Sequence, residues 1–327
     1  MAVISYIDAI KLALREEMQK DEKVFILGED VGKKGGVFKA TEGLYDEFGE
    51  DRVIDSPLTE SAIAGVGVGA AMYGYRPIAE IQFADFIMPA VNQIISEASR
   101  IRYRSNNDWS CPMVIRAPFG GGIHGGLYHS QSVEKVFFGQ PGLKIVVPSN
   151  PYDAKGLLKA AIRDNDPVLF FEHKKAYRLL KGEVPETDYV VPIGKANVVR
   201  EGTDITVITY GLAVEFAKEA ANRLAADGYD VHILDLRTIY PLDKESIIEA
   251  AKKTGKVLLV TEDNLEGSII GEVSAIISEN CLFDLDAPIA RLAGPDVPAM
   301  PFAITMEKYF TIDPDKIEVV MRELAEF

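Results

Sequence analysis

Strand-like and helix-like segments alternate along the whole chain, and this alternation restricts the fold more than any other feature of the sequence. It predicts an α/β protein with largely parallel sheets, because parallel strands must be joined by crossover connections that are usually helical. In the first half, the strand-like runs are residues 24–28, 52–55, 77–83, 113–116, 144–147 and 168–171. The clearest helical stretch covers residues 85–104, where apolar residues recur at helical spacing.

A second block of the same kind follows a polar segment that contains two prolines. Its strand-like runs are residues 205–210, 230–236, 256–260 and 288–292, with helical stretches between them and a short helix at the end of the chain. The length of 327 residues is also that of two domains. We expect an N-terminal domain over residues 1–184, a linker over 185–202 and a C-terminal domain over 203–327.

The composition excludes several classes of protein. With 35 basic and 50 acidic residues, the net charge is −15, which argues against nucleic-acid binding and is compatible with a basic protein partner. No apolar run approaches the ~20 residues of a membrane-spanning helix, and the N-terminus does not look like a signal peptide. Cys111 and Cys281 belong to no metal-binding or disulfide pattern, so we expect a protein of a reducing cytoplasm.

Glu60 lies in a segment that carries no other charge after Asp55 for more than ten residues. Pro57 and Thr59 predict that a helix begins there, and small residues follow. In one interpretation, Glu60 caps this helix and its carboxylate offsets the helix dipole. In the other, Glu60 binds a ligand and shares a proton with a ring nitrogen, because a carboxylate in apolar surroundings needs a specific partner.

Gly65, Gly67, Gly69 and Ala70 nominally match the G-x-G-x-x-A pattern of dinucleotide-binding proteins. These glycines lie within the predicted helix and not at a turn between a strand and a helix. We therefore expect no nicotinamide site here. Glycines along a helix instead permit the close approach of another helix, which would suit a subunit interface.

A glycine-rich stretch at residues 119–131 contains His124 and His129, two of the four histidines in the chain. Five of the eight residues from 120 to 127 are glycine, so the loop is costly to order. Loops of this kind often border ligands or move. The histidines are either solvated on a flexible loop, or one of them is an acid or base. No third or fourth ligand is nearby in the sequence, so we do not expect zinc.

Short motifs along the whole chain resemble the β subunit of the decarboxylating component of 2-oxo acid dehydrogenase complexes, which depends on thiamine diphosphate. The residues that carry this resemblance are 28–32, 35–38, 41–44, 52–60, 79–83, 102–104, 127–131, 141–144, 235–237 and 240–242. Residues 81–85 and 127–131 are most similar to the bacterial branched-chain type. The resemblance implies an N-terminal pyrimidine-binding domain and a C-terminal transketolase-like domain.

The same resemblance assigns roles to individual residues. Glu60 corresponds to the residue that activates the aminopyrimidine of the cofactor, and Leu58, Gln82 and Phe86 correspond to residues that line the pyrimidine pocket. Animal branched-chain enzymes have Tyr at the position of Phe86, so a hydroxyl group is missing here. His129 corresponds to the histidine implicated in transfer of the acyl group to lipoyl-lysine.

The metal ions implied by the resemblance fall partly outside this chain. Thiamine diphosphate needs a divalent ion, typically held by a Gly-Asp-Gly…Asn motif, and the sequence contains no Gly-Asp-Gly. A partner α chain would then hold Mg²⁺ and the diphosphate. Animal relatives also hold a structural potassium ion, and Ala161, Asp164 and Asp166 fall where some of its ligands would be. Asp166 replaces an Asn of those relatives.

The implied assembly is an α2β2 heterotetramer that decarboxylates branched-chain 2-oxo acids, in the catabolism of branched-chain amino acids. The acyl group would pass to a lipoyl domain of the dihydrolipoyl acyltransferase core, whose basic docking domain would bind the acidic subunit. Three alternatives remain open at this stage: pyruvate or another short 2-oxo acid as substrate, a non-catalytic scaffold subunit, and a nicotinamide-dependent dehydrogenase.

Overall fold

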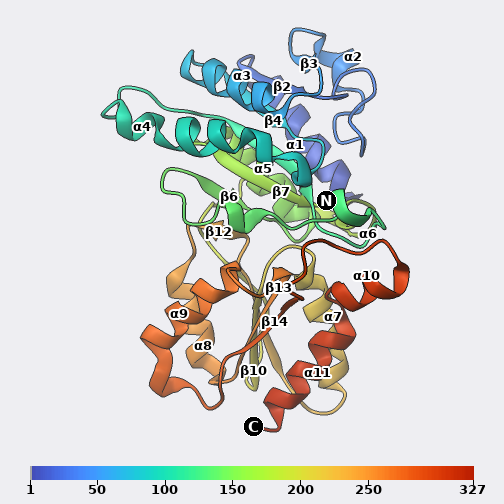
Figure 1. Ribbon diagram of the computed structural model, residues 1–327, viewed down its shortest axis with the longest axis vertical. Helices are drawn as coiled ribbons and strands as arrows, with labels where there is room; N and C mark the ends of the chain where they lie inside the picture. The colour runs from blue at the N-terminus through green and yellow to red at the C-terminus, as the bar shows by residue number, and fades with distance from the viewer. Residues whose placement is uncertain (1) are drawn as a thin grey trace. The chain divides into compact units, whose positions relative to one another are not determined.

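The computed structural model describes residues 2–327 and consists of two compact α/β units (Figure 1). The first unit contains the residues up to Phe119 together with Val136–Ile193. The second unit contains Gly120–Lys135 together with Gly194–Phe327. The predicted fold class is confirmed, since both units contain a sheet of mainly parallel strands with helices packed against it.

The sheet of the first unit contains six parallel strands in the order β6, β7, β5, β4, β2, β3. They are β2 (Val24–Gly28), β3 (Val53–Asp55), β4 (Arg76–Glu80), β5 (Val114–Phe119), β6 (Lys144–Val146) and β7 (Val168–His173). Every strand predicted for this half is present. The regular helices are α1 (Tyr6–Lys20), α2 (Leu44–Phe48), α3 (Glu60–Met72), α5 (Pro151–Arg163) and α6 (Ala176–Leu179). Helices α1 and α5 pack against each other, and α3 packs on β4.

The prediction of one regular α-helix over residues 85–104 is wrong, because the hydrogen-bonding pattern changes several times along this segment. The segment consists of 3₁₀ turns at Ala84–Phe86, Met88–Ala90 and Ala98–Arg100, a π-helical stretch at Asn92–Glu97 and α4 (Ile101–Arg104). Pro89 has no N–H to donate, and the Ser99 hydroxyl donates to the Ile95 carbonyl at 2.7 Å, so side chains interfere with a regular ladder. The apolar periodicity still predicted burial correctly, because the isoleucines at 87, 94 and 101 are fully buried.

The second unit contains a five-stranded sheet in the order β14, β13, β10, β11, β9, in which only β9 is antiparallel to its neighbour. The helices and strands of this unit are β9 (Asn197–Arg200), β10 (Ile205–Thr209), α7 (Ala213–Ala225), β11 (Val231–Asp235), β12 (Thr238–Tyr240), α8 (Lys244–Thr254), β13 (Val257–Asn264), α9 (Ile269–Cys281), β14 (Ala290–Gly294), α10 (Ile304–Phe310) and α11 (Pro314–Ala325). Helices α8 and α9 cover one face of the sheet, and α7 and α11 cover the other (Figure 1).

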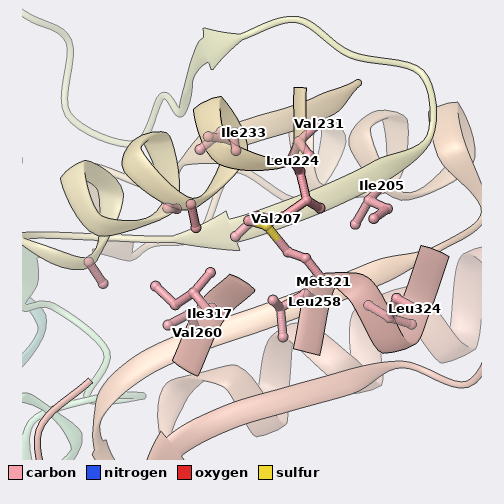
Figure 2. Packing of buried hydrophobic residues seen from close by; sticks show 14 of the residues in the cluster. Ile205, Val207, Leu224, Val231, Ile233, Leu258, Val260, Ile317, Met321 and Leu324 are labelled. Atoms are coloured by element: carbon pink, nitrogen blue, oxygen red, sulfur yellow. The ribbon is translucent and has the colours of Figure 1, made fainter. Parts of the chain in front are cut away.

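The core of the second unit forms where α7 and α11 meet the sheet. Figure 2 shows Leu224 of α7 and Met321 of α11 directed toward the apolar side chains of β10, β11 and β13. These residues recur every three or four positions in the helices and every second position in the strands, as expected for elements that each bury one face.

The segment between the two blocks is more structured than expected. Strand β8 (Lys181–Val184) pairs antiparallel with β1 (Ala2–Ser5) in the first unit. Within the predicted linker 185–202, β9 joins the sheet of the second unit. In the sequence, the boundary between the units lies between Ile193 and Gly194. The second unit also contains Gly120–Lys135, which the sequence analysis assigns to the N-terminal domain. Polar edge strands carry little of the apolar alternation that identifies a strand in sequence.

Among residues 2–327, no helix combines the length and the apolar character needed to cross a lipid bilayer.

A fully buried arginine connects three neighbouring strands of the first unit. Arg116 of β5 donates from Nε and Nη2 to the two carboxylate oxygens of Glu172 in β7, at 2.6 and 2.7 Å. Its Nη1 donates to Glu80 of β4 at 2.6 Å, and the Tyr177 hydroxyl donates to Glu172 at 2.5 Å. Both glutamates are almost completely buried, and burial raises the pKa of Glu80. The arginine therefore offsets charges that have no access to water.

We expect Arg116→Met to lower the free energy of unfolding by about 3–5 kcal/mol, because it leaves two buried carboxyl groups without their cation. Chemical denaturation of the two proteins measures the difference. A matched control is Arg104→Met, since Arg104 forms an exposed ion pair with Glu97 at 2.9 Å and should contribute about 1 kcal/mol or less. Equal effects of the two substitutions would contradict the structural role assigned to Arg116.

Candidate active site

The predicted cofactor residues follow three strands that are neighbours in the sheet of the first unit. The strands lie in the order β4, β2, β3 and are parallel, so their carboxyl ends meet at one edge. Glu29 follows β2, the segment with Leu58 and Glu60 follows β3, and Gln82 follows β4. Ligands of parallel α/β sheets bind at this kind of edge. The fold therefore brings together residues that are distant in the sequence.

Glu60 is the first residue of α3, as predicted, and it follows the N-cap residue Thr59. Its side chain is half-buried and forms no hydrogen bond or ion pair with any residue from 2 to 327. The carboxylate is close enough to act on Glu29, whose pKa is raised by burial first and then by the negative charges of Asp30 and Glu60. Glu60 is thus a carboxylate at a helix N-terminus with no protein group to receive or share a proton.

Glu29 is a candidate site residue that the sequence interpretation missed. It follows the fully buried strand β2 directly, and such a position marks the carboxyl end of a parallel strand. That position was the signal that could have identified it. Its electrostatic coupling to Glu60 puts a second carboxyl group at the same place in the fold.

The other three predicted cofactor residues provide apolar surface and one amide. Leu58 is 70% exposed, which is unusual for a leucine and leaves its side chain available for contact. Gln82 donates from Nε2 to Asp30 at 3.3 Å, and Phe86 packs edge-on against Phe83 with ring centroids 5.9 Å apart.

The short 3₁₀ turn that carries Phe86 is held in place by a buried ion pair. Lys174 lies 3.5 Å from Asp85, and the side chains of both residues are almost completely inaccessible to solvent. Ion pairing of two buried charges fixes the turn relative to the end of β7.

These residues fit the aminopyrimidine half of thiamine diphosphate. A planar heterocycle with amino and ring nitrogen atoms needs apolar contact for its faces and polar partners for its edge. In such a site, Leu58 and Phe86 would supply the apolar contact, and Gln82 and the unpartnered carboxylate of Glu60 would supply the polar partners. Among residues 2–327, no group of three or more His, Cys, Asp and Glu side chains could hold a metal ion.

The glycines that nominally match a dinucleotide fingerprint lie inside α3, so the expected objection to a nicotinamide site is confirmed. A Cβ atom on Gly67 would lie 2.8 Å from the terminal methyl of Met113, whereas one on Gly69 would meet nothing within 4 Å. Gly67 therefore allows α3 to approach the sheet closely, and Gly69 leaves the opposite side of the helix without bulk.

The two histidines of the glycine-rich stretch lie in the second unit and have different environments. His124 has a positive φ of 62°, and its Nδ1 lies 3.0 Å from a carboxylate oxygen of Glu307. Its ring also packs on Phe302, with the centroids 4.4 Å apart. His129 is half-buried and follows the 3₁₀ turn Gly126–Tyr128. The exposed His124 is engaged in a structural contact with Glu307.

The predicted potassium ligands are close together but are paired with protein cations. Lys144 Nζ lies 2.8 and 2.6 Å from the two carboxylate oxygens of Asp164, and 3.6 Å from Asp166. Arg102 Nε lies 2.5 Å from the other oxygen of Asp166, and the Ala161 carbonyl accepts the Asp164 N–H at 3.2 Å. The carboxylates of Asp164 and Asp166 therefore already have protein cations as partners, and the potassium site stays a prediction.

Two parts of the chain match domains of known proteins. Residues 2–179 match the pyrimidine-binding domain of transketolase, and residues 194–317 match the C-terminal domain of transketolase. A solved structure described as "Split gene transketolase, inactive beta4 tetramer" has the same fold, with a TM-score of 0.80 and 22% identity over 99% of this chain and 98% of that one.

Two relatives from Bacillus subtilis match over the full length of both chains. The chain is 77% identical to a 2-oxoisovalerate dehydrogenase subunit beta and 46% identical to a pyruvate dehydrogenase E1 component subunit beta. A pyruvate dehydrogenase E1 component subunit beta from Staphylococcus aureus is 47% identical over 90% of this chain and 91% of its own length. Together with the two matched domains, these identities show that the chain belongs to the transketolase-like family of 2-oxo acid dehydrogenase β subunits.

Proposed function

We propose that this chain is the β subunit of a branched-chain 2-oxo acid dehydrogenase. With an α subunit it would decarboxylate 3-methyl-2-oxobutanoate, 4-methyl-2-oxopentanoate and 3-methyl-2-oxopentanoate, and it would pass the acyl group to lipoyl-lysine. The identity of 77% to the 2-oxoisovalerate relative, against 46–47% for the pyruvate relatives, supports the branched-chain substrates over pyruvate.

The observation that carries this proposal is the unpartnered carboxylate of Glu60 at the carboxyl edge of β3, β2 and β4. Thiamine diphosphate, when bound, supplies the carbanion chemistry that a protein side chain cannot provide. Glu60 would share a proton with a ring nitrogen of the aminopyrimidine and so set its tautomer. The nearby Glu29, with its raised pKa, would limit the negative charge at the site by holding a proton more readily than an exposed glutamate.

The remaining site residues of the first unit would position the ring and exclude water. Leu58 and Phe86 would cover its apolar surface, and the Gln82 amide would fix its orientation at the polar edge. Exclusion of water strengthens the interaction between Glu60 and the ring nitrogen, because the local dielectric constant falls.

The diphosphate and Mg²⁺ would be held by the α subunit of an α2β2 tetramer. His129, on the loop of the second unit, would act when the acyl group is transferred to the lipoyl domain of the acyltransferase core. The net charge of −15 supports association of the core through a basic docking domain.

We expect Glu60→Gln to lower kcat for decarboxylation of 3-methyl-2-oxobutanoate by at least about 100-fold, the lower end for loss of an acid–base group. The assay contains thiamine diphosphate, Mg²⁺ and the co-expressed α chain, and pyruvate is tested in parallel. The tetramer should still assemble, as judged by size-exclusion chromatography. Glu50→Gln, on an exposed glutamate of the same unit, is the matched control. Near-normal turnover of Glu60→Gln would refute its role, and faster turnover of pyruvate would refute the branched-chain substrates.

We expect His129→Ala to reduce acyl transfer to an isolated lipoyl domain by about 100-fold or more. Decarboxylation measured with an artificial electron acceptor should change much less, because that reaction does not require the lipoyl group. The two assays on one preparation separate the steps. A parallel loss in both assays would show that His129 acts in decarboxylation, or that the whole site is disturbed.

We expect the melting temperature to be the same in KCl and NaCl at equal ionic strength. The carboxylates of Asp164 and Asp166 already have Lys144 and Arg102 as partners, so a specific cation has no free carboxylate to bind. A ligand that binds only the folded state would raise the melting temperature with its concentration. A higher melting temperature in KCl alone would support the potassium site predicted from the family resemblance.

A further inference from the structure

The loop that carries His129 is rich in glycine and has little regular hydrogen bonding of its own backbone. Gly120–Lys135, here called the histidine loop, contains five glycines and no regular helix or strand apart from short 3₁₀ turns. Three of its glycines and His124 have positive φ angles. Ordering such a segment costs more conformational entropy than ordering an average loop of this length. Specific contacts must therefore hold it.

The first half of the loop is held by two carboxylates of the second unit. The Gly121 N–H donates to Glu262 of β13 at 2.5 Å. The His124 N–H and Nδ1 both contact Glu307 of α10, at 3.2 and 3.0 Å. A Cβ atom on Gly121 would lie 2.4 Å from the Met300 methyl, so a larger residue here would require the Met300 side chain to move.

The second half of the loop, beyond His129, ends in a buried carboxyl group. Glu134 is completely inaccessible to solvent, and the Tyr210 hydroxyl at the end of β10 donates to its Oε1 at 2.8 Å. Tyr210 is itself 2.7 Å from the hydroxyl of Thr261 in β13. The neighbouring Lys135 lies 3.0 Å from Asp263 of the same strand.

The two buried acids Glu134 and Asp263 differ in the charge of their partners. Asp263, which is also buried, has the Lys135 ammonium as its partner, whereas Glu134 accepts a hydrogen bond from the neutral hydroxyl of Tyr210 and has no cation as a partner among residues 2–327. Oε2 of Glu134 accepts no hydrogen bond from residues 2–327. Burial, then the charge of Asp263 and to a smaller extent that of Glu262, raise the pKa of Glu134 to about 8. A pKa of about 8 keeps Glu134 mostly protonated at neutral pH.

We propose that Glu134 is a positioning residue for His129, because its buried carboxyl group ties the end of the histidine loop to Tyr210 and β13 of the second unit. This inference rests on the proposed role of His129 in acyl transfer. Glu134 fits its site only in the neutral form. Ionisation would add an uncompensated negative charge beside Asp263 and Glu262, with Lys135 already engaged.

The sign of the pH effect follows from the pKa of Glu134. In the docked loop its pKa is about 8, against 4.5 for an exposed glutamate, so the docked state binds more protons between these values. The stabilisation by docking is fully present below pH 4.5 and is lost as the pH rises toward 8. Within this interval, the equilibrium for loop opening can change by up to about tenfold per pH unit.

The test is hydrogen exchange of the full-length chain at pH 6 and pH 8, followed by mass spectrometry of peptides from the histidine loop. After correction for intrinsic exchange, we expect protection of the wild-type loop to fall by at least about tenfold over this range. Glu134→Gln mimics the neutral acid and should keep the same protection at both pH values. Glu279→Gln, on an exposed glutamate of α9, should behave as wild type.

Asp263→Asn provides a second test if Glu134→Gln does not fold. Removal of the neighbouring charge lowers the pKa of Glu134, so the loss of protection should move to lower pH. A wild-type loop whose protection is the same at pH 6 and pH 8 would overturn the proposal. So would a Glu134→Gln protein with the wild-type pH dependence.

An activity measurement connects the loop to His129. In the complex with the α chain, acyl transfer to the lipoyl domain should fall from pH 6 to pH 8 more steeply in wild type than in Glu134→Gln, while decarboxylation with an artificial acceptor responds equally in both. If the exchange results hold but His129→Ala transfers normally, the proposed role of His129 fails and the loop contact stands. If His129→Ala is defective but exchange is independent of Glu134, only the positioning role fails.

Discussion

Burial of Arg116 between Glu80 and Glu172 is the interaction on which the geometry of the first unit depends. The guanidinium holds β4, β5 and β7 in one register through three buried hydrogen bonds to the carboxylate oxygens of Glu80 and Glu172. An ion group of this kind specifies position more than it adds stability, because the cost of desolvation is large. Glu80 lies two residues before Gln82, so Arg116 also helps to fix the edge of the sheet that carries the proposed cofactor residues.

An acidic chain that buries carboxyl groups must compensate each of them, and this protein does so in two ways. Glu80 and Glu172 receive a buried cation. Glu134 has no cation and retains a proton instead. Glu60 is only half-buried and has no ion pair or hydrogen bond with residues 2–327, which is why we propose that its carboxylate serves a ligand and not the fold. Comparing the partners of buried acids is thus a physical means of separating functional from structural residues.

The alternation of apolar runs was sufficient to predict the six strands of the first sheet and the parallel strands of the second, because buried parallel strands are apolar on both faces. It was not sufficient for β8 and β9, which are polar edge strands stabilised by pairing with β1 and β11. It also overstated the regularity of residues 85–104. There Pro89 and Ser99 alter the hydrogen bonding, while the burial of the isoleucines follows the predicted period.

The sequence by itself determined the fold class, the position of Glu60 at the start of a helix and the family, since each depends on local pattern or on short motifs. Only the tertiary structure decided which charged residues are partners. Glu29 and Glu60 are separated by α2, β3 and loops in the sequence but follow adjacent strands in the sheet. The histidine loop belongs to the second unit through Glu134, Tyr210 and Asp263, which lie as much as 129 residues apart. Electrostatic energies depend on distance and burial in space, and neither can be read from spacing along the chain.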